Sequence, residues 1–167
     1  VFAFKDDSVS VGVRGPVSVH SAFSVLPVSI DSMQITKSVN SETKEKKSSD
    51  TMGMKHKIYS ALYVIKGSIN HQLAGKTGFS DEDAEKIKEA LRTLFVNDSS
   101  SARPDGSMEV CKVYWWRHNC PMGQYSSAKV HRLIDITAKT DDPKEFEDYH
   151  IEVASLPDLV LEEIEGI

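Results

Sequence analysis

The sequence predicts an α+β fold with an antiparallel sheet, and three observations lead to this prediction. Short segments of alternating or β-branched apolar residues recur along the chain, one long amphipathic segment lies among them, and turn-rich clusters separate the two kinds. The chain has 167 residues, 40% of them hydrophobic, which suffices for one domain with a core of ordinary size. The order strand, polar insertion, strand, helix, strand favours a ferredoxin-like arrangement.

The N-terminal thirty residues predict strands. Apolar positions alternate in residues 1–5 and 9–13, on either side of the turn-rich cluster KDDS, as they do in a hairpin. The following segment, GPVSVHSAFSVLPVSI, predicts a long strand that breaks at Pro27. Because the chain starts at Val1 within a strand pattern and without an initiator Met, we expect that an N-terminal part of a longer protein is missing.

Two contrasting segments follow. Residues 31–50 are rich in Ser, Thr, Lys and Glu and have almost nothing to bury, so we expect an exposed arm or a mobile loop. Residues 58–69, IYSALYVIKGSI, are rich in β-branched and aromatic residues, which predicts a central strand buried on both faces.

The segment SDEDAEKIKEALRTLF, residues 80–95, predicts the clearest helix. Ser80 can cap the free N–H groups of the first turn, and the three acidic residues after it complement the positive end of the helix dipole. The apolar stripe consists of Ala84, Ile87, Leu91 and Leu94. We expect the opposite face to be solvated, so that Lys88→Ala has almost no effect on stability.

The remaining segments predict further strands and a final helix. Residues 108–118, MEVCKVYWWRH, have the composition of a strand, and residues 128–139 form a mixed segment that ends in a strand. Residues 147–153 predict a last strand, and residues 156–167, LPDLVLEEIEGI, predict a short helix.

The charge is unevenly distributed along the chain. The formal net charge of −5 alone argues against a nucleic-acid binder. However, residues 141–167 hold ten acidic residues and one base, which leaves 19 bases and 15 acids, a net charge of +4, in residues 1–140. The acidic total is therefore a property of the C-terminal segment.

The cysteines and the hydropathy exclude several classes of protein. Cys111 and Cys120 form neither a disulfide framework nor a CxxC metal pair, which favours a reduced, cytoplasmic protein without a bound metal. No apolar run approaches the roughly 20 residues that span a bilayer. We therefore expect no membrane function.

A basic cluster lies on and beside the polar insertion. Three acidic residues offset its seven members, which are Lys37, Lys44, Lys46, Lys47, Lys55, His56 and Lys57. Burial cannot order such a segment, whereas phosphate groups can do so through charge attraction and counterion release. The alternative is a solvated charged loop without a ligand.

Other candidate residues give weaker signals. The loop SSSARPDG presents Ser101 and Arg103, whose side chains suit phosphate contacts, although the same letters form an ordinary turn. His56, His118 and His131 could serve in acid–base chemistry, and His118 with Cys120 could be half of a metal site. However, no carboxylate or second Cys/His pair lies nearby at a ligand spacing. We therefore expect no catalytic residue, metal or cofactor.

In order along the chain, the segments RGPVSVHSAFSVLPV, TMGMKHKIYSALYVIKGSIN, LAGKTGFSDEDAEKIKEALRTLF and NDSSSAR resemble one family. The chain is similar to the backbone subunit of the type I-C CRISPR Cascade surveillance complex, a member of the RAMP superfamily. The resemblance covers residues 1 to about 137. It includes a GPVQ-type strand, an MGRKH-type junction and a KTGFSEED-type helix start.

The resemblance implies an RRM-like palm with an inserted polar thumb. The palm would comprise residues 1–30 and 57–140, the thumb residues 31–56, and an acidic C-terminal segment residues 141–167. Several copies would form a helical filament along one CRISPR guide RNA, together with other Cascade subunits in antiviral defence. Target DNA would bind through the guide, so sequence recognition would come from base pairing.

The resemblance and the basic cluster together predict the residues that contact RNA. These are Arg14, Ser18, Lys37, Lys44, Lys46, Lys47, Lys55, His56, Lys57, Ser101 and Arg103. Two positions depart from the family: Met54 stands where an arginine is usual, and Ser18 where a glutamine is usual. A bidentate guanidinium contact is thus absent at position 54.

Two alternative functions stay open at this point. One is a metal-independent endoribonuclease of the same superfamily that processes CRISPR repeat RNA, with His56 or His131 as general base and Tyr59 or Lys57 assisting. The other is a sheet-mediated interaction module that binds no nucleic acid. Cleavage of repeat RNA would identify the first, and assembly without salt-sensitive RNA affinity the second.

Overall fold

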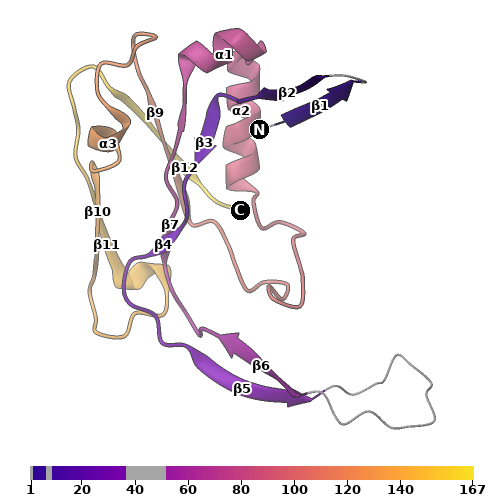
Figure 1. Ribbon diagram of the computed structural model, residues 1–167. Coiled ribbons are helices and arrows are strands. Elements are labelled where there is room, and N and C mark those ends of the chain that lie inside the picture. The colour runs from indigo at the N-terminus through magenta and orange to yellow at the C-terminus, as the bar shows by residue number, and fades with distance from the viewer. Residues whose placement is uncertain (1, 7–8, 37–51) are drawn as a thin grey trace. The chain divides into compact units, whose positions relative to one another are not determined.

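A computed structural model describes residues 2–6, 9–36 and 52–167 (Figure 1). The described residues form short antiparallel strand pairs and three α-helices, which confirms the predicted α+β class. The chain divides into two compact units. The first unit comprises residues 1–22, 65–136 and 151–167, and the second unit comprises residues 23–64 and 137–150.

The predicted N-terminal hairpin is confirmed. Strand β1 (Phe2–Asp6) pairs antiparallel with β2 (Val9–Val13), so that the backbone of Phe2 lies opposite that of Val13. This pair belongs to the first unit.

The predicted strand over residues 58–69 is wrong as a continuous, buried element. In the first unit, β3 (Val17–Val19) pairs with β8 (Gly67–Ile69), and in the second unit β4 (Phe23–Ser24) pairs with β7 (Tyr63–Val64). Tyr59 is 78% exposed, and the side chains of Tyr63 and Ile65 are also exposed.

A β-bulge explains why these strands are short. The amide of His20 donates to the carbonyl of Lys66, and Phe23 is paired with Val64. Two residues on the first strand therefore lie opposite Ile65 alone on the second, which is the arrangement of a bulge. The same bulge interrupts the long strand predicted for residues 15–30. The chain passes from the first unit to the second between residues 22 and 23, and back between residues 64 and 65.

Two helices follow in the first unit. Helix α1 (His71–Thr77) was not predicted; Asn70 caps its N-terminus by accepting from the amide of Leu73, and Gly78 ends it with a left-handed φ of 71°. Helix α2 (Asp81–Arg92) confirms the predicted helix and its cap. Ser80 and Asp83 form a reciprocal capping box at its start.

The expectation that the face of α2 carrying Lys88 is solvated is wrong. Lys88 is 9% exposed, and its Nζ donates to Glu162 at 2.6 Å and lies 2.8 Å from Glu85. The ammonium also lies 5.5 Å from the ring centroid of Trp115. Because the sheet packs beside this face of the helix, the long side chain is covered and its charge is balanced by carboxylates.

The predicted C-terminal helix is also wrong, because the segment forms a strand. Strand β12 (Val160–Glu165) pairs antiparallel with β9 (Lys112–Arg117), which confirms the predicted strand over residues 108–118 in shorter form. Lys112 lies 2.9 Å from Glu165 and 3.8 Å from Glu163 across the pair. Cross-strand pairing thus outweighs the helix propensity of Leu and Glu.

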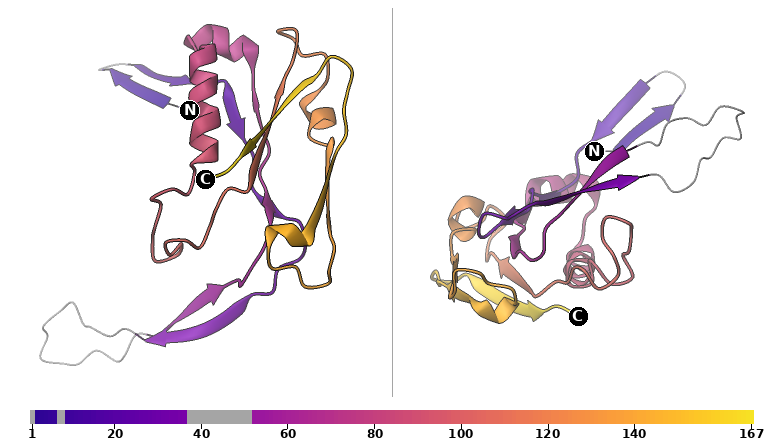
Figure 2. Two further views of the ribbon diagram at one scale, coloured as in Figure 1. Left: turned by 180° about the vertical axis from the view of Figure 1, so that it is seen from behind. Right: turned by 90° about the horizontal axis from the view of Figure 1, so that it is seen from below.

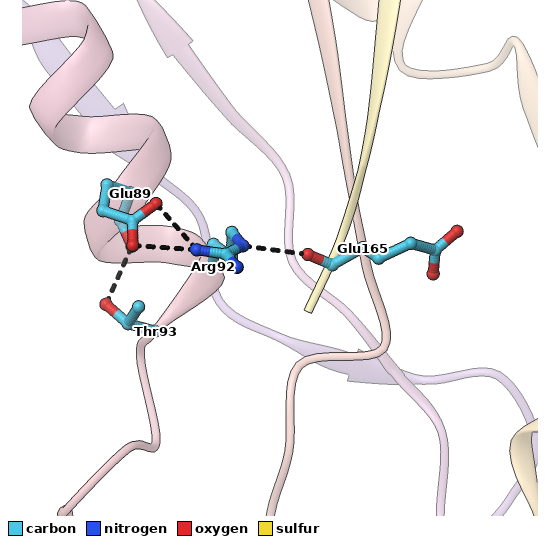
Figure 3. A network of polar contacts seen from close by, with 4 residues as sticks. All are labelled: Glu89, Arg92, Thr93 and Glu165. Carbon is cyan, nitrogen blue, oxygen red and sulfur yellow. Dashed lines mark hydrogen bonds and ion pairs between the residues drawn. The ribbon is translucent and has the colours of Figure 1, made fainter. Parts of the chain in front are cut away.

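A polar network joins the end of α2 to the end of β12 (Figure 3). The Arg92 guanidinium donates to both carboxylate oxygens of Glu89, at 2.9 and 3.1 Å, and to the carbonyl oxygen of Glu165 at 3.3 Å. Thr93 donates its hydroxyl to the carbonyl of Glu89 at 2.8 Å. The network thus ties the last turn of α2 to the C-terminal end of β12 through the Arg92 side chain.

The remaining elements follow the predicted order. Helix α3 (Ser127–Val130) precedes β10 (Ile134–Ala138), and a 3₁₀ turn (Phe146–Asp148) precedes β11 (Tyr149–Val153), which pairs with β10. These strands confirm the strand predictions for residues 128–139 and 147–153. The most buried apolar residues of the described chain are Ala74, Val130, Leu133 and Tyr149.

The second unit contains a two-stranded ribbon. Strand β5 (Asp31–Thr36) pairs antiparallel with β6 (Met52–Lys57), and no third described strand joins them. The ribbon extends away from β4 and β7 of the same unit (Figures 1 and 2). The predicted exposed arm therefore begins as a strand, and residues 37–51 of that prediction lie outside the described residues.

Candidate nucleic-acid interface

The β5–β6 ribbon positions the three described cations of the basic cluster. Its register places Met33 opposite Lys55, Ser32 opposite His56 and Asp31 opposite Lys57. Lys55, His56 and Lys57 thus lie within strand β6 of the ribbon. Lys37, Lys44, Lys46 and Lys47 lie outside the described residues.

Strand alternation separates these cations onto two faces. Successive side chains of a strand point to opposite sides, and residues that pair across strands share a side. We call one side the lysine face; it carries Asp31, Met33, Ile35, Lys55 and Lys57. We call the other side the methionine face; it carries Ser32, Gln34, Thr36, Met52, Met54 and His56.

The two lysines of the lysine face differ in their partners. The Nζ of Lys57 lies 3.5 Å from Asp31 and 4.7 Å from the ring centroid of Tyr59. Tyr59 first, and then Asp31, raise the pKa of Lys57 above its ordinary value, so the side chain stays charged. Lys55 is exposed and has no ionic partner within the described part of the chain. Among the described residues, no carboxylate therefore competes with a ligand for Lys55.

The side chain of His56 is engaged on the methionine face. Its Nδ1 lies 2.7 Å from the hydroxyl of Ser32. Nearby, the side-chain amide nitrogen of Gln34, Nε2, donates to the sulfur of Met52 at 2.8 Å. Met52 and Met54 are more than half exposed. The methionine face thus carries no acidic side chain and is partly apolar.

Arg103 and Ser101 belong to the first unit, in the loop after α2. The Arg103 guanidinium donates to both oxygens of Asp98, at 3.1 and 3.2 Å, and its amide donates to the Ser100 hydroxyl at 3.1 Å. This bidentate pair neutralises the arginine locally. The side chain of Ser101 is exposed.

Arg14 and Ser18 also belong to the first unit. Arg14 is exposed directly after β2, and Ser18 lies in β3 opposite Ser68. The carbonyl of Ser18 lies so close to Gly67 that a Cβ there would meet it at 2.8 Å. The predicted contacts are thus divided between the two units.

His118 and His131, which lie outside the ribbon, contact groups other than carboxylates. His118 Nδ1 lies 3.2 Å from the amide oxygen of Gln124. His131 Nε2 lies 2.9 Å from the carbonyl oxygen of Gly67, and its ring packs edge-on against His20 at 5.7 Å between centroids. Neither arrangement is a nucleophile or base oriented by an acid.

The described residues contain no group of three or more His, Cys, Asp or Glu that could hold a metal ion. Neither Cys111 nor Cys120 forms a disulfide. Among the helices that the structure describes, none is long and apolar enough to cross a bilayer.

Sequence reasoning missed the role of Asp31. The composition places Asp31 only in a polar insertion. In the structure its carboxylate accepts a hydrogen bond from the Tyr59 hydroxyl at 3.1 Å and forms an ion pair with Lys57. The register of the two strands sets this contact, because it pairs position 31 with position 57, which is distant in the sequence. No local sequence pattern predicts this contact.

Comparison with known proteins identifies a protein family that matches this chain. The family model described as CRISPR-associated protein Cas7 matches residues 1–154. No curated protein matches the sequence.

Proposed function

Because the chain belongs to the family of CRISPR-associated protein Cas7, we propose that it is a non-catalytic subunit that binds CRISPR RNA through phosphate contacts made by the lysine face. The observation that carries this proposal is the exposed β5–β6 ribbon, on which Lys55 has no described ionic partner and shares a face with Lys57. A polyanion is the ligand that such a face attracts.

The chemistry of the lysine face suits an RNA backbone. Lys55 can contact a phosphate directly, whereas Lys57 must first exchange its contact with Asp31. Both contacts are independent of base identity, so sequence recognition is left to pairing between guide and target. Arg103 can join the interface only by releasing Asp98, and Arg14 needs no such exchange among the described residues.

The finer assignment follows the resemblance to the type I-C backbone subunit. We infer an RRM-like palm in residues 1–30 and 57–140, a thumb in residues 31–56 and an acidic C-terminal segment in residues 141–167. The β5–β6 ribbon at the base of residues 31–56 supports the assignment of the thumb. An isolated two-stranded hairpin is only marginally stable in water, so a binding partner is expected to stabilise this ribbon.

Exposed apolar side chains support assembly with other subunits or with further copies. Large apolar residues of the second unit that are more than half exposed include Phe23, Ile30, Met52 and Met54. No large side chain of the described part is fully buried. A protein that works alone in water rarely leaves this much apolar surface uncovered. Target DNA would join such an assembly through the guide.

The endoribonuclease alternative gains no support from the contacts of its two candidate bases, His56 and His131. His56 is bound to Ser32, and His131 to the carbonyl of Gly67. Incubation of the protein with CRISPR repeat RNA, followed by a denaturing gel, is expected to show intact RNA. Cleavage that His56→Ala or His131→Ala abolishes would overturn the non-catalytic assignment.

The salt dependence of RNA affinity tests the proposal. The affinity of the 167-residue protein for single-stranded RNA is measured between about 50 and about 200 mM salt, for the unchanged protein, Lys55→Ala and Glu82→Ala. Lys55→Ala should lower the slope of log affinity against log salt by about 0.7, the value for one phosphate contact on a single strand. Glu82→Ala, on the exposed side of α2, should leave the slope unchanged. An unchanged slope for Lys55→Ala would remove the lysine face from the RNA site.

A further inference from the structure

An open cleft of about 490 Å³ lies within the second unit, next to the ribbon. Its walls are Tyr59 and Ser60 on one side and Asp142, Lys144 and Glu145 on the other. The Ser60 hydroxyl donates to the carbonyl of Pro143 at 3.5 Å, which joins the two walls.

The acidic wall has a fixed backbone. One carboxylate oxygen of Asp148 accepts from the amides of Lys144 and Glu145, at 2.9 and 3.1 Å. These two bonds hold the pKa of Asp148 below its ordinary value, so the carboxylate stays ionised at neutral pH. The backbone of residues 144–148 is thereby held in one turn.

The aromatic wall already holds a cation. The Tyr59 hydroxyl donates to Asp31 at 3.1 Å, which fixes the ring, and the Lys57 ammonium lies 4.7 Å from the ring centroid. Lys57 does not line the cleft. Tyr59 is 78% exposed, so its ring remains accessible from the cleft. The ring thus presents π-electron density to the cleft.

The cleft has an excess of negative charge. Lys144 lies 3.4 Å from Asp142 and balances it. Glu145 has no cationic partner within the described part of the chain. An exposed aromatic ring and an unbalanced carboxylate therefore face the same space.

We propose that this cleft binds the guanidinium group of an arginine from a partner protein, with its plane against the Tyr59 ring and its N–H groups donating to Glu145. A guanidinium is flat, weakly hydrated and able to stack on an aromatic ring while it binds a carboxylate in a bidentate manner. A lysine ammonium lacks the flat surface, and the unbalanced charge of Glu145 disfavours an RNA phosphate in the cleft. None of the residues that line the cleft belongs to the lysine face, although Tyr59 contacts Lys57 and Asp31 of that face.

The test uses the isotope-labelled 167-residue protein and two peptides. The first is acetyl-Gly-Arg-Gly-amide, and the second replaces arginine with citrulline, which has the same shape without the charge. The arginine peptide should shift the backbone NMR signals of Ser60 and Glu145 in a saturable manner. The citrulline peptide should bind about fivefold or more weakly, as expected for the loss of one partly exposed ion pair. Equal affinity of the two peptides would overturn the proposal.

Matched variants locate the site. Glu145→Gln should weaken binding of the arginine peptide about fivefold, and Tyr59→Leu should weaken it as well. Glu147→Gln removes the same charge from the same loop outside the cleft and should have no effect. An equal loss in Glu147→Gln would show unspecific attraction and contradict the proposal.

The NMR spectrum of Glu145→Gln away from the cleft checks that the fold is intact, and its RNA affinity should be unchanged. Displacement of the arginine peptide from Ser60 and Glu145 by an oligouridine would assign the cleft to nucleic acid and overturn the proposal. RNA binding that is lost while the peptide still binds would instead refute only the function of the lysine face.

Discussion

Lys88 shows at the scale of one residue how a charge is held inside this fold. Its hydrogen bond to Glu162, and then that to Glu85, raise the pKa of the ammonium above its ordinary value. The aliphatic part of the side chain lies between α2 and the β9–β12 pair, and the ammonium approaches Trp115. The residue therefore connects a helix to both strands of a sheet.

Replacement of Lys88 is expected to destabilise the protein. Lys88→Ala removes a charged hydrogen bond and the packing of a long side chain, which should cost about 1–3 kcal/mol of unfolding free energy. Lys86→Ala, on the same helix, changes the same charge where the side chain is 74% exposed, so it should cost little. Urea unfolding of both variants measures the difference, and equal midpoints would show that the Lys88 contacts contribute nothing.

At the scale of the element, helix α2 has a start that depends on pH. The amide and hydroxyl of Ser80 hold the pKa of Asp83 below its ordinary value of 3.8. A carboxyl with a lowered pKa in the folded state stabilises the protein above the unfolded pKa. That stabilisation is lost as the pH falls through the folded pKa.

Asp83→Ala tests this dependence. The variant should be less stable than the unchanged protein at neutral pH, and the difference should shrink as the pH falls below 3.8. Asp81→Ala changes a charge in the same turn without removing the capping box, so it serves as the control. Thermal unfolding across this pH range measures the effect. A difference for Asp83→Ala that stays constant with pH would contradict the assignment of the cap.

Elements with local signals could be predicted from the sequence. Ser80, the acidic first turn and the apolar spacing of Ile87 and Leu91 all lie within sixteen consecutive residues, and they predicted α2 and its cap. Strand β12 could not be predicted, because its Leu and Glu residues favour a helix in isolation. Its state depends on pairing with β9, which is distant in the sequence.

The candidate site was predictable only in part. The composition of residues 31–57 indicated a basic cluster, but not that a ribbon register would put His56 and Lys55 on opposite faces. Likewise, the composition of residues 58–69 indicated strand propensity, but not the bulge that lies opposite Ile65. Register and bulges depend on how two segments align, and single-segment patterns do not contain that information.

At the scale of the whole molecule, an acidic protein is proposed to bind an acidic polymer. The formal net charge is −5, so a uniform field would repel RNA. Binding must therefore come from a local face whose charges lie within a Debye length of the phosphates, about 8 Å at physiological salt. On the lysine face, Lys55 is the cation without a described ionic partner.

A comparison of RNA affinity between Lys55→Gln and Gln34→Glu tests the lysine face most directly. Each variant lowers the net charge by one at an exposed ribbon position, Lys55 on the lysine face and Gln34 on the methionine face. At about 50 mM salt, Lys55→Gln should weaken binding about threefold to tenfold, and Gln34→Glu less than about twofold. Equal losses would show that only the overall charge matters, and a larger loss for Gln34→Glu would place the RNA on the methionine face; either result would contradict the account.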